Sequence, residues 1–526
     1  MRLLPYDRDI PLWMLYPVFF VAIYLSHLTL LRLPYYWDEA GYYIPAALDF
    51  YRHHWLIPQS TLANSHPPLP SILLTAAWHV TGLVISGTRT FICMVSAAAL
   101  LGIYRLARIL AGVPVAAATT LLTAIYPIWF TQSTLAHADI FAAAFTLWAL
   151  SFYLEIKLTT APPCERKLAT IAILFTLAAL SKETAIVTPI ALAAWEAWQL
   201  RRPENRRAHA TQLAALLSPA IPLAAWFAYY HHKTGYTFGN PEYLRYNATA
   251  NFGVHRITIA LLHRAMHLTL HMNLYVATTC LLTALLMPRV RPDRIARPAL
   301  HAIAVVLCAN WIAFSILGGA LLNRYLLPLY PLILLFCVVQ WHAHMQRWWL
   351  LVALTSVGFL AGLFVNPPYG FSPEDNLAYR DMILLHQQAV SLIAHQYPQA
   401  TVLTAWPATN ELSQPDLGYT SQPVATVPIQ DFTFAELQSA AADPGAYDTA
   451  LIFSTKYIPP GLDIGRSGES SAIRYFDFHQ DVSPHAAALM LHGEVVWQGR
   501  HNGQWAAVLR FPRSVEARLS TPAPPL

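Results

Sequence analysis

The sequence predicts a mainly helical protein that crosses a membrane many times and ends in a small α/β domain. Of its 526 residues, 56% are hydrophobic and 12% are charged, and the mean hydropathy is +0.39. Soluble domains carry about 25% charged residues. Apolar stretches of about 20 residues, the length that a helix needs to cross a bilayer, recur through the first 365 residues and then stop. This composition excludes an ordinary soluble enzyme.

About eleven membrane spans are expected in the first part of the chain. Their centres fall near residues 22, 99, 122, 147, 174, 192, 220, 275, 308, 332 and 357. Lys and Arg collect in alternate loops, which predicts a cytoplasmic N-terminus and an outer C-terminus. The opening apolar run lacks a small-residue cleavage site, so we expect it to remain as the first span. We therefore predict a multi-pass protein of the cell (inner) membrane, whose formal charge of +5 reflects orientation and not a nucleic-acid partner.

Much of the chain outside the spans is predicted to lie on the outer side. Residues 33–88 form the first outer loop, in which residues 38–52 and 68–84 have the pattern of amphipathic, aromatic-rich helices lying in the membrane interface. Such helices can hold a site at the membrane surface. With this loop included, residues 1–365 form the predicted transmembrane domain.

Residues 366–526 are predicted to form a small extracytoplasmic α/β domain. The pattern indicates one helix, two buried strands and a hairpin, at residues 374–397, 401–405, 450–454 and 495–511. Asn502-Gly503 marks the turn of the hairpin. None of the five cysteines falls in this part and the chain has no Cys-x-x-Cys pair, so neither disulfides nor a cysteine metal site is expected.

Two adjacent acids follow the first span within an aromatic stretch. The carboxylate of Asp38 or Glu39 could take a proton from an acceptor hydroxyl. The same acids would also stabilise the N-terminus of a helix under an interfacial aromatic belt. Ionisable residues beside a membrane are costly to keep, which makes both acids candidates for catalysis.

His66 precedes two prolines in the same outer loop. Pro67 and Pro68 stiffen the chain and start the next helix, which limits the directions in which the imidazole can point. A rigid histidine near the lipid headgroups can donate a hydrogen bond to a phosphate. A turn with an incidental exposed histidine has the same sequence pattern.

Cations stand at the outer ends of two predicted spans, against the positive-inside bias. Lys182 ends the fifth span, and Arg324, followed by Tyr325, begins the tenth. Arg offers phosphate a two-pronged fork and Lys a compact charge. The alternative is snorkelling to the surface, with Lys182 paired to Glu183.

Asp139 is a lone acid at the outer start of the fourth span. It could position an acceptor or cap its helix.

Acids, a rigid histidine and cations therefore fall at one predicted membrane face, and this set suits a displacement in which a phosphate leaves. Such chemistry requires no metal or other cofactor, because fixed cations can stabilise the leaving phosphate, although a divalent ion near the acids is compatible with it.

With these motifs the chain resembles glycosyltransferases of the GT-C class. The resemblance is to the broad group, similar to family 39, that includes protein O-mannosyltransferases and the lipid A aminoarabinose transferases. It extends to about residue 365. The motifs that carry it are Asp38-Glu39, His66-Pro67-Pro68-Leu69, Asp139, Lys182-Glu183 and Arg324-Tyr325-Leu326-Leu327-Pro328.

The resemblance implies an inverting sugar transfer. In that reaction a sugar on a polyprenyl or dolichyl monophosphate is attacked at its anomeric carbon by an acceptor hydroxyl. Asp38 matches the base of the family and Glu39 its acidic neighbour. His66 and Lys182 fall where contacts with the donor phosphate are expected, and Arg324 matches the cation before the tenth span.

The acceptor could be a lipid, a glycan or a protein. The His-Pro-Pro form is closer to the O-mannosyltransferases than the Lys-Pro-Pro form usual in aminoarabinose enzymes, yet no MIR domain is recognisable in the chain.

Two other functions are alternatives for a polytopic membrane protein. A lipid or polysaccharide transporter would favour charged residues in mid-span and broken helices in matching halves, which are not evident. An O-antigen ligase-like polymerase typically uses a large late outer loop, whereas the largest loop between spans here is the early one at residues 33–88.

Overall fold

The chain forms two compact units. The computed structural model describes residues 11–62, 64–159, 163–201, 206–239, 241, 252–292, 295–317, 321–457 and 479–511. The first unit contains Met1–Arg32, Tyr42–Asn366 and Glu374–Asn376, and the second contains Leu33–Gly41, Pro367–Pro373 and Leu377–Leu526. The segment that carries Asp38 and Glu39 therefore belongs with the C-terminal part of the chain.

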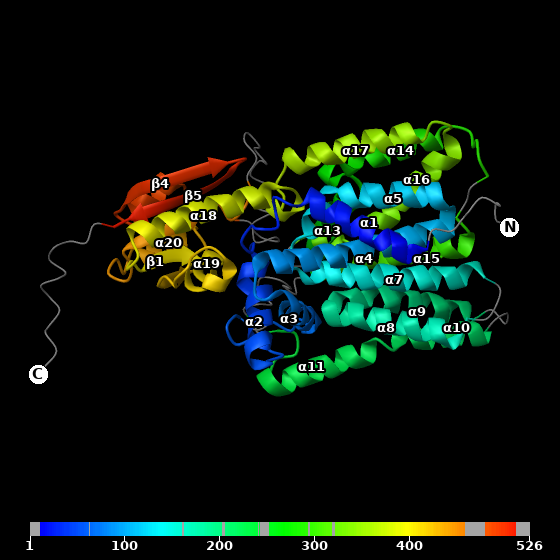
Figure 1. The fold of residues 1–526 in the computed structure, drawn as a ribbon, viewed down its shortest axis with the longest axis horizontal. Coiled ribbons are helices and arrows are strands. Elements are labelled where there is room, and N and C mark those ends of the chain that lie inside the picture. The colour runs from blue at the N-terminus through cyan, green and yellow to red at the C-terminus, as the bar shows by residue number, and fades with distance from the viewer. Residues whose placement is uncertain are drawn as a thin grey trace, which may run out of the picture. The chain divides into compact units, whose positions relative to one another are not determined.

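The first unit is a bundle of helices (Figure 1). Its long helices α4 (Ile85–Ala111), α7 (Ala138–Leu158) and α8 (Glu165–Ser181) pack in that order. The other helices of the bundle are α1 (Leu12–Ser26), α2 (Ile44–His53), α3 (Leu69–Thr81), α5 (Val113–Ile125), α6 (Pro127–Gln132), α9 (Val187–Gln199), α10 (Arg206–Leu217), α11 (Ala220–Thr234), α13 (Val254–Thr269), α14 (Leu274–Leu285), α15 (Arg297–Ile316), α16 (Tyr330–His344) and α17 (Trp349–Phe364).

Short turns join several of these helices. A π-helical turn, η1 (Glu39–Tyr43), precedes α2. Four turns of 3₁₀-helix are η2 (Glu183–Ile186), η3 (His271–Asn273), η4 (Asn323–Leu326) and η5 (Pro373–Asp375). Three of them, η2, η4 and η5, carry or adjoin charged residues of the candidate site.

Five helical segments in the described part of the chain are long and apolar enough to cross a membrane. They are Ile85–Ala111, Ala138–Leu158, Arg206–Thr234, Val254–Leu285 and Arg297–Ile316. Each of the eleven predicted span centres lies within a helix, but the other six lie in helices of 13 to 17 residues. The prediction of a polytopic helical protein is confirmed in this coarser form, and the count of eleven stays a prediction.

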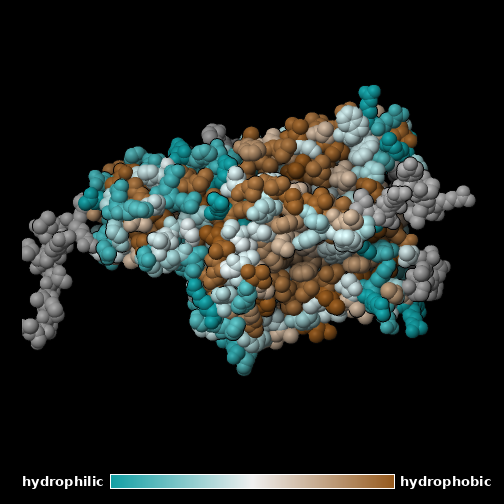
Figure 2. Space-filling view, viewed as in Figure 1, coloured by the Kyte–Doolittle hydropathy of each residue, from teal (hydrophilic) through white to brown (hydrophobic). Residues whose placement is uncertain are grey.

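Large hydrophobic side chains point out from the first unit. Trp13, Ile221, Leu282 and Val357 are 64–73% exposed. Figure 2 shows hydrophobic residues over the middle of the helical unit and hydrophilic residues gathered toward its ends. An exposed apolar surface of this kind is costly in water and favourable in contact with lipid tails. The described helices are therefore those of a membrane protein.

The loop at residues 33–88, predicted to lie on the outer side, contains helices, as the sequence predicts. Its amphipathic helices are α2 and α3, and α3 ends at Gly82, whose φ of 75° favours glycine. The carboxylate of Asp49 accepts hydrogen bonds from the backbone N–H groups of Gln59 and Ser60, at 2.6 and 2.8 Å. These bonds tie the connection after α2 back onto that helix.

The second unit contains a five-stranded sheet in the order β2-β1-β3-β5-β4. The strands β1 (Val402–Ala405), β2 (Thr426–Ile429) and β3 (Thr449–Phe453) are parallel, whereas β5 (Gln504–Arg510) runs antiparallel to both β3 and β4 (Glu494–His501). Helix α18 (Ala378–Gln396) packs on β4 and β5. Three shorter helices complete the described part of this unit: α19 (Ala408–Ser413), α20 (Phe434–Ala440) and α22 (Pro484–Met490).

The predicted helix, two strands and hairpin of this unit are confirmed by α18, β1, β3 and the β4–β5 pair. The strand β2 was not predicted from the sequence. This strand is only four residues long and contains Pro428, which removes a hydrogen-bond donor and usually argues against a strand. The structure places it at the edge of the sheet, where a missing donor is tolerated.

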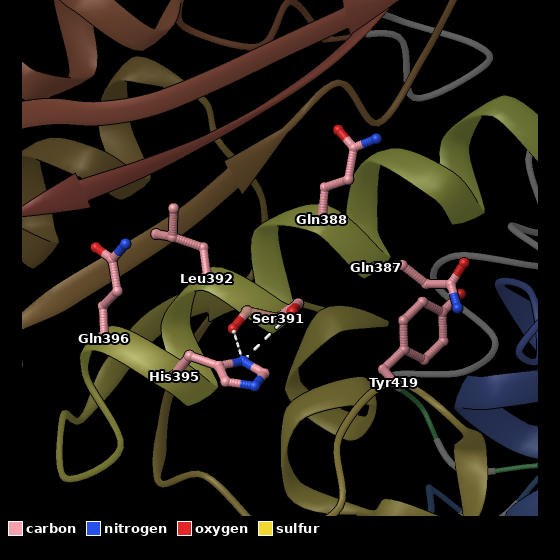
Figure 3. A pocket seen from close by; sticks show the side chains of 7 residues that line it. All are labelled: Gln387, Gln388, Ser391, Leu392, His395, Gln396 and Tyr419. Carbon is pink, nitrogen blue, oxygen red and sulfur yellow. Dashed lines mark hydrogen bonds between the residues drawn. The ribbon is translucent and has the colours of Figure 1, made fainter.

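A shallow hollow of about 690 Å³ lies on the surface of α18. Figure 3 shows that polar side chains line most of it. They are Gln387, Gln388, Ser391, His395, Gln396 and Tyr419, together with Leu392. No residue predicted to act in the site lines this hollow.

Candidate functional site

Two cations and two carboxylates meet in the first unit, and we call Asp139, Lys182, Arg324 and Glu374 the charge cluster. The Lys182 ammonium donates to Asp139 Oδ1 at 2.5 Å, and Arg324 Nε lies 3.2 Å from Asp139 Oδ2. The Nη1 group of Arg324 donates to Glu374 Oε2. All four residues are buried. Residues from distant parts of the sequence thus form one continuous ionic network.

Each member of the charge cluster comes from the end of a helix or from a turn. Asp139 is the second residue of α7, and Lys182 directly follows the last residue of α8. Arg324 lies in η4 and Glu374 in η5. Helix ends leave backbone groups without intrahelical partners and mark where the chain leaves the bundle. The cluster therefore lies where side chains from several helix ends can converge.

Tyr325 completes the surroundings of the two cations. The Lys182 ammonium lies 3.7 Å from the centroid of its ring, and the Arg324 guanidinium carbon lies 5.7 Å away. The ring in turn stacks on Phe314 at 6.0 Å. A cation over an aromatic face is stabilised without neutralising its charge, so Tyr325 can hold Lys182 in place while leaving it able to attract an anion.

Burial acts on the charges of this cluster. It lowers the pKa of Lys182, which lies between α8 and η2, although the carboxylate of Asp139 opposes this shift. The pKa of the neighbouring His137 lies well below its ordinary value of 6.5, because burial and the positive charge of Arg324 disfavour the imidazolium. Its Nδ1 is 3.0 Å from Gln132 Oε1. His137 is therefore neutral at neutral pH.

His66 lies beside this region and forms its own ion pair. Its Nδ1 is 2.8 Å from Glu183 Oε2. Its ring is nearly parallel to that of Tyr43, with centroids 6.4 Å apart, and Tyr43 lies 5.7 Å from the ring of His137. Burial raises the pKa of Glu183, but His66 and then Lys182 outweigh it and leave that pKa below its ordinary value. Glu183 is therefore ionised and orients His66.

The structure decides between several alternatives left open by the sequence. Lys182 contacts Asp139, so the alternative pairing of Lys182 with Glu183 is wrong. The carboxylate of Asp139 lies against both cations, Lys182 and Arg324. Glu39 does support its own turn, because its carboxylate accepts the backbone N–H of Tyr36 at 2.9 Å.

A second polar network supports two members of the charge cluster from behind. The side-chain amide of Asn323, the neighbour of Arg324, donates to Asp375 Oδ2 at 2.7 Å. Asp375, the neighbour of Glu374, is also 3.0 Å from His271 Nε2. This network fixes η4 to η5 and thereby sets how Arg324 meets Glu374.

A small cavity adjoins the charge cluster. Its volume is about 20 Å³, enough for about one water molecule. Its charged and aromatic walls are Asp139, Lys182, Arg324 and Tyr325, and Thr188 and Asn310 add polar groups. A sugar does not fit this space.

Asp38 and Glu39 lie in the second unit, where the surrounding segment is firmly packed. Trp37 has a φ of 42°, and its ring meets that of Trp406 edge to face at 5.3 Å. Asn410 donates to the carbonyl oxygen of Ala40 at 3.2 Å. Asp38 itself is half-buried. The β-sheet unit thus holds the turn that presents this carboxylate.

Sequence reasoning missed Glu374 and His137. Glu374 follows the last apolar stretch on the predicted outer side, as does the neighbouring Asp375, and this acidic pair is a signal that could have been used. His137 lies two positions before Asp139, but the sequence around it carries no comparable signal. Within the described residues, no three His, Cys, Asp or Glu side chains are placed to hold a metal ion.

Part of the first unit matches a family model. Residues 65–226 match the model described as dolichyl-phosphate-mannose-protein mannosyltransferase. The matched stretch contains His66, Asp139 and Lys182. No curated protein matches the chain significantly.

Solved structures resemble the chain over almost its whole length. ArnT from Cupriavidus metallidurans bound to undecaprenyl phosphate is 13% identical, with a TM-score of 0.56 over 94% of this chain and 97% of that one. Its apo state is 14% identical, with a TM-score of 0.56 over 95% and 98%. The Archaeoglobus fulgidus oligosaccharyltransferase complex with Zn and sulfate is 12% identical, with a TM-score of 0.49 over 84% and 68%. The fold is shared with ArnT, and the predicted resemblance to GT-C glycosyltransferases is confirmed.

Proposed function

We propose that this chain is a membrane glycosyltransferase that moves a sugar from a polyprenyl monophosphate to an acceptor hydroxyl at the outer face of the membrane. The observation that carries the proposal is the charge cluster, in which Lys182 and Arg324 are brought together by Asp139. Two cations at one point among apolar helices are costly unless they serve a purpose such as binding an anion. A lipid-linked phosphate is an anion that reaches such a place.

The comparisons support the same reaction class. The family model that matches residues 65–226 is described by a dolichyl-phosphate-linked sugar donor. ArnT, which shares the fold, is seen with undecaprenyl phosphate. Both point to a lipid monophosphate as the leaving group, with membrane lipids as the surrounding solvent.

In the proposed mechanism the acceptor hydroxyl attacks the anomeric carbon while the bond from that carbon to the phosphate oxygen breaks. Asp38 takes the proton of the hydroxyl, which becomes the new glycosidic oxygen. The pair of electrons of the broken bond stays on the phosphate. Because attack and departure occur on opposite sides of the carbon, the configuration inverts. Glu39 supports the turn that presents Asp38.

The cations act on the departing phosphate. Arg324 can give it two parallel hydrogen bonds and Lys182 a compact charge. Preorganised charges of this kind stabilise the phosphate as it gains charge and need no rearrangement at that moment. His66, oriented by Glu183 at 2.8 Å, is proposed as a further donor to the phosphate, and Tyr325 and Asp139 position the cations.

The two parts of the chain have different proposed roles. Residues 1–365, with Glu374–Asn376 packed among them, form the catalytic membrane domain and bind the lipid-linked donor. The rest of residues 366–526 forms an extracytoplasmic domain that binds the lipid, glycan or protein acceptor. The packing of the segment Leu33–Gly41 with the second unit supports a role for this unit in presenting Asp38.

Mass spectrometry of glycans and glycolipids, in cells with and without the gene, tests the proposal. We expect one class of glycoconjugate to disappear without the gene, to return with the intact gene, and to stay absent with Asp38→Asn or Arg324→Ala. Glu155→Gln is a matched control, since Glu155 pairs with Arg105 and Lys167 outside the charge cluster. Unchanged glycoconjugates in all strains would refute the proposal.

A second experiment separates an enzyme from a transporter. Purified protein in detergent has no two compartments, so a transporter yields no product there. We expect the glycosyltransferase to convert a polyprenyl-phosphate-linked sugar and to release polyprenyl phosphate. Absence of turnover, with intact donor binding, would favour the transporter.

A further inference from the structure

One carboxylate of the charge cluster sits where the donor phosphate is expected to bind. Glu374 Oε2 accepts from Nη1 of the Arg324 guanidinium, while Asp139 contacts its Nε at 3.2 Å. Two cations and two carboxylates give these four side chains no net charge. An incoming phosphate would therefore meet no excess of positive charge.

We propose that Glu374 belongs to the donor site and that its carboxylate occupies the Arg324 fork until the donor phosphate replaces it. This inference rests on the function proposed above and names a residue of the same site. A carboxylate and a phosphate present similar paired oxygen acceptors to a guanidinium. Exchange of one for the other keeps Arg324 paired with an anion before and after the phosphate binds.

Of the two carboxylates, Glu374 is the one that can leave. Asp139 contacts both Lys182 and Arg324, and its departure would separate the two cations. Of the two cations, Glu374 contacts Arg324 and not Lys182. It lies on a three-residue turn, and its side chain is longer than that of Asp139. Release of Glu374 therefore disrupts one ion pair and keeps the cation pair assembled.

The backbone around Glu374 is fixed independently of its carboxylate. The hydroxyl of Thr131 donates to the carbonyl oxygen of Glu374. Asp375 is held by Asn323 and His271, and the side-chain amide of Asn376 donates to Asn366 Oδ1 at 3.0 Å. The Glu374 side chain can therefore rotate away from Arg324 without a change in the backbone that carries it.

Removing the competing charge should strengthen phosphate binding. In Glu374→Gln a neutral amide stands against Arg324, so undecaprenyl phosphate no longer displaces an anion. We expect the Kd of undecaprenyl phosphate for the purified full chain in nanodiscs to fall about tenfold. If Glu374 instead serves only to orient Arg324, the same substitution should leave the Kd unchanged or raise it, and either result overturns the inference.

Two further variants make the outcome interpretable. Glu155→Gln removes a carboxylate from an ion pair with Arg105 outside the donor site, so its Kd should match that of the unchanged protein. Arg324→Ala should lose binding, and if it binds normally the proposed donor site itself fails. Loss of binding in Arg324→Ala without tightening in Glu374→Gln would overturn only the role of Glu374.

A conservative variant covers the case in which Glu374→Gln does not fold. Glu374→Asp keeps the charge but draws it back from Arg324 by one methylene group. We expect a smaller fall in the Kd, of about threefold, with a thermal unfolding midpoint close to that of the unchanged protein. A rise in the Kd for a well-folded Glu374→Asp protein would contradict the exchange.

Discussion

The ion pair between Asp139 and Lys182 should contribute strongly to stability, and a double-mutant cycle can measure it. The two side chains are only 2% and 6% exposed, and their charged atoms are 2.5 Å apart. Removing one partner of a buried ion pair costs about 3–5 kcal/mol, because the other charge stays buried. In Asp139→Asn the Arg324 guanidinium keeps Glu374, so we expect a loss near 3 kcal/mol.

The second substitution of the cycle should restore part of this loss. Lys182→Met replaces the ammonium with an apolar side chain of similar length, and a buried ion pair replaced by apolar groups is often nearly neutral. The double variant Asp139→Asn, Lys182→Met should therefore be more stable than Asp139→Asn alone. The coupling energy should be about 1–3 kcal/mol.

Thermal unfolding in detergent, followed by intrinsic fluorescence, orders the four proteins. We expect the midpoint of Asp139→Asn to be the lowest and that of the double variant to be higher. Sugar transfer should still be reduced in the double variant, because it lacks Lys182, one of the two cations proposed to hold the phosphate. Strictly additive midpoints would refute the reasoning, since they would mean that Asp139 and Lys182 do not interact.

Three further perturbations test other parts of the molecule. Gly41→Ala should lower stability by about 1–3 kcal/mol and reduce transfer, since its Cβ would fall 2.1 Å from the Trp406 ring. In the control Gly445→Ala the nearest contact of the new Cβ is at 3.9 Å, so neither the thermal midpoint nor the activity should change. The folded-state pKa of His137 lies well below 6.5, so its contribution to stability is present above pH 6.5 and is lost as the pH falls below 6.5. The thermal midpoint should therefore decline less from pH 7 to 5 in His137→Gln than in the unchanged protein, and an identical decline would exclude this role. Arg324→Lys should recover only part of the donor use lost in Arg324→Ala, because the two-pronged fork is missing, and full recovery would show that a point charge suffices.

Much of the fold follows from local sequence patterns. The helix α3 and the hairpin of β4 and β5 lie close to their predicted positions, because amphipathic periodicity and a turn at Asn502-Gly503 act over a few residues. The helix predicted over residues 38–52 begins as the π-helical turn η1, and α2 itself starts only at Ile44. The short strand β2 was missed because its Pro428 is acceptable only at a sheet edge. Whether a strand lies at an edge depends on its neighbours in space.

The candidate site was only partly predictable. Asp139, Lys182 and Arg324 stood out because each places a charge at the predicted outer end of an apolar stretch, where a charge is costly. Their mutual contacts could not be read from the sequence, and the pairing of Lys182 with Glu183 had the advantage of adjacency. Glu374 stood beyond the last apolar stretch and had no spacing that related it to Arg324.

The sequence by itself determined that this chain is a helical membrane protein with a small α/β part, and which charges stand at the ends of apolar stretches. Both follow from composition and from periodicity along the chain, because contact with lipid or with the core selects apolar residues over a whole segment or along one of its faces. Only the tertiary structure decided that Lys182 contacts Asp139, that Glu374 contacts Arg324, and that Glu183 takes His66. These pairings join residues 43 to 117 positions apart, and a contact over such a distance depends on how the helices pack and not on any pattern within them.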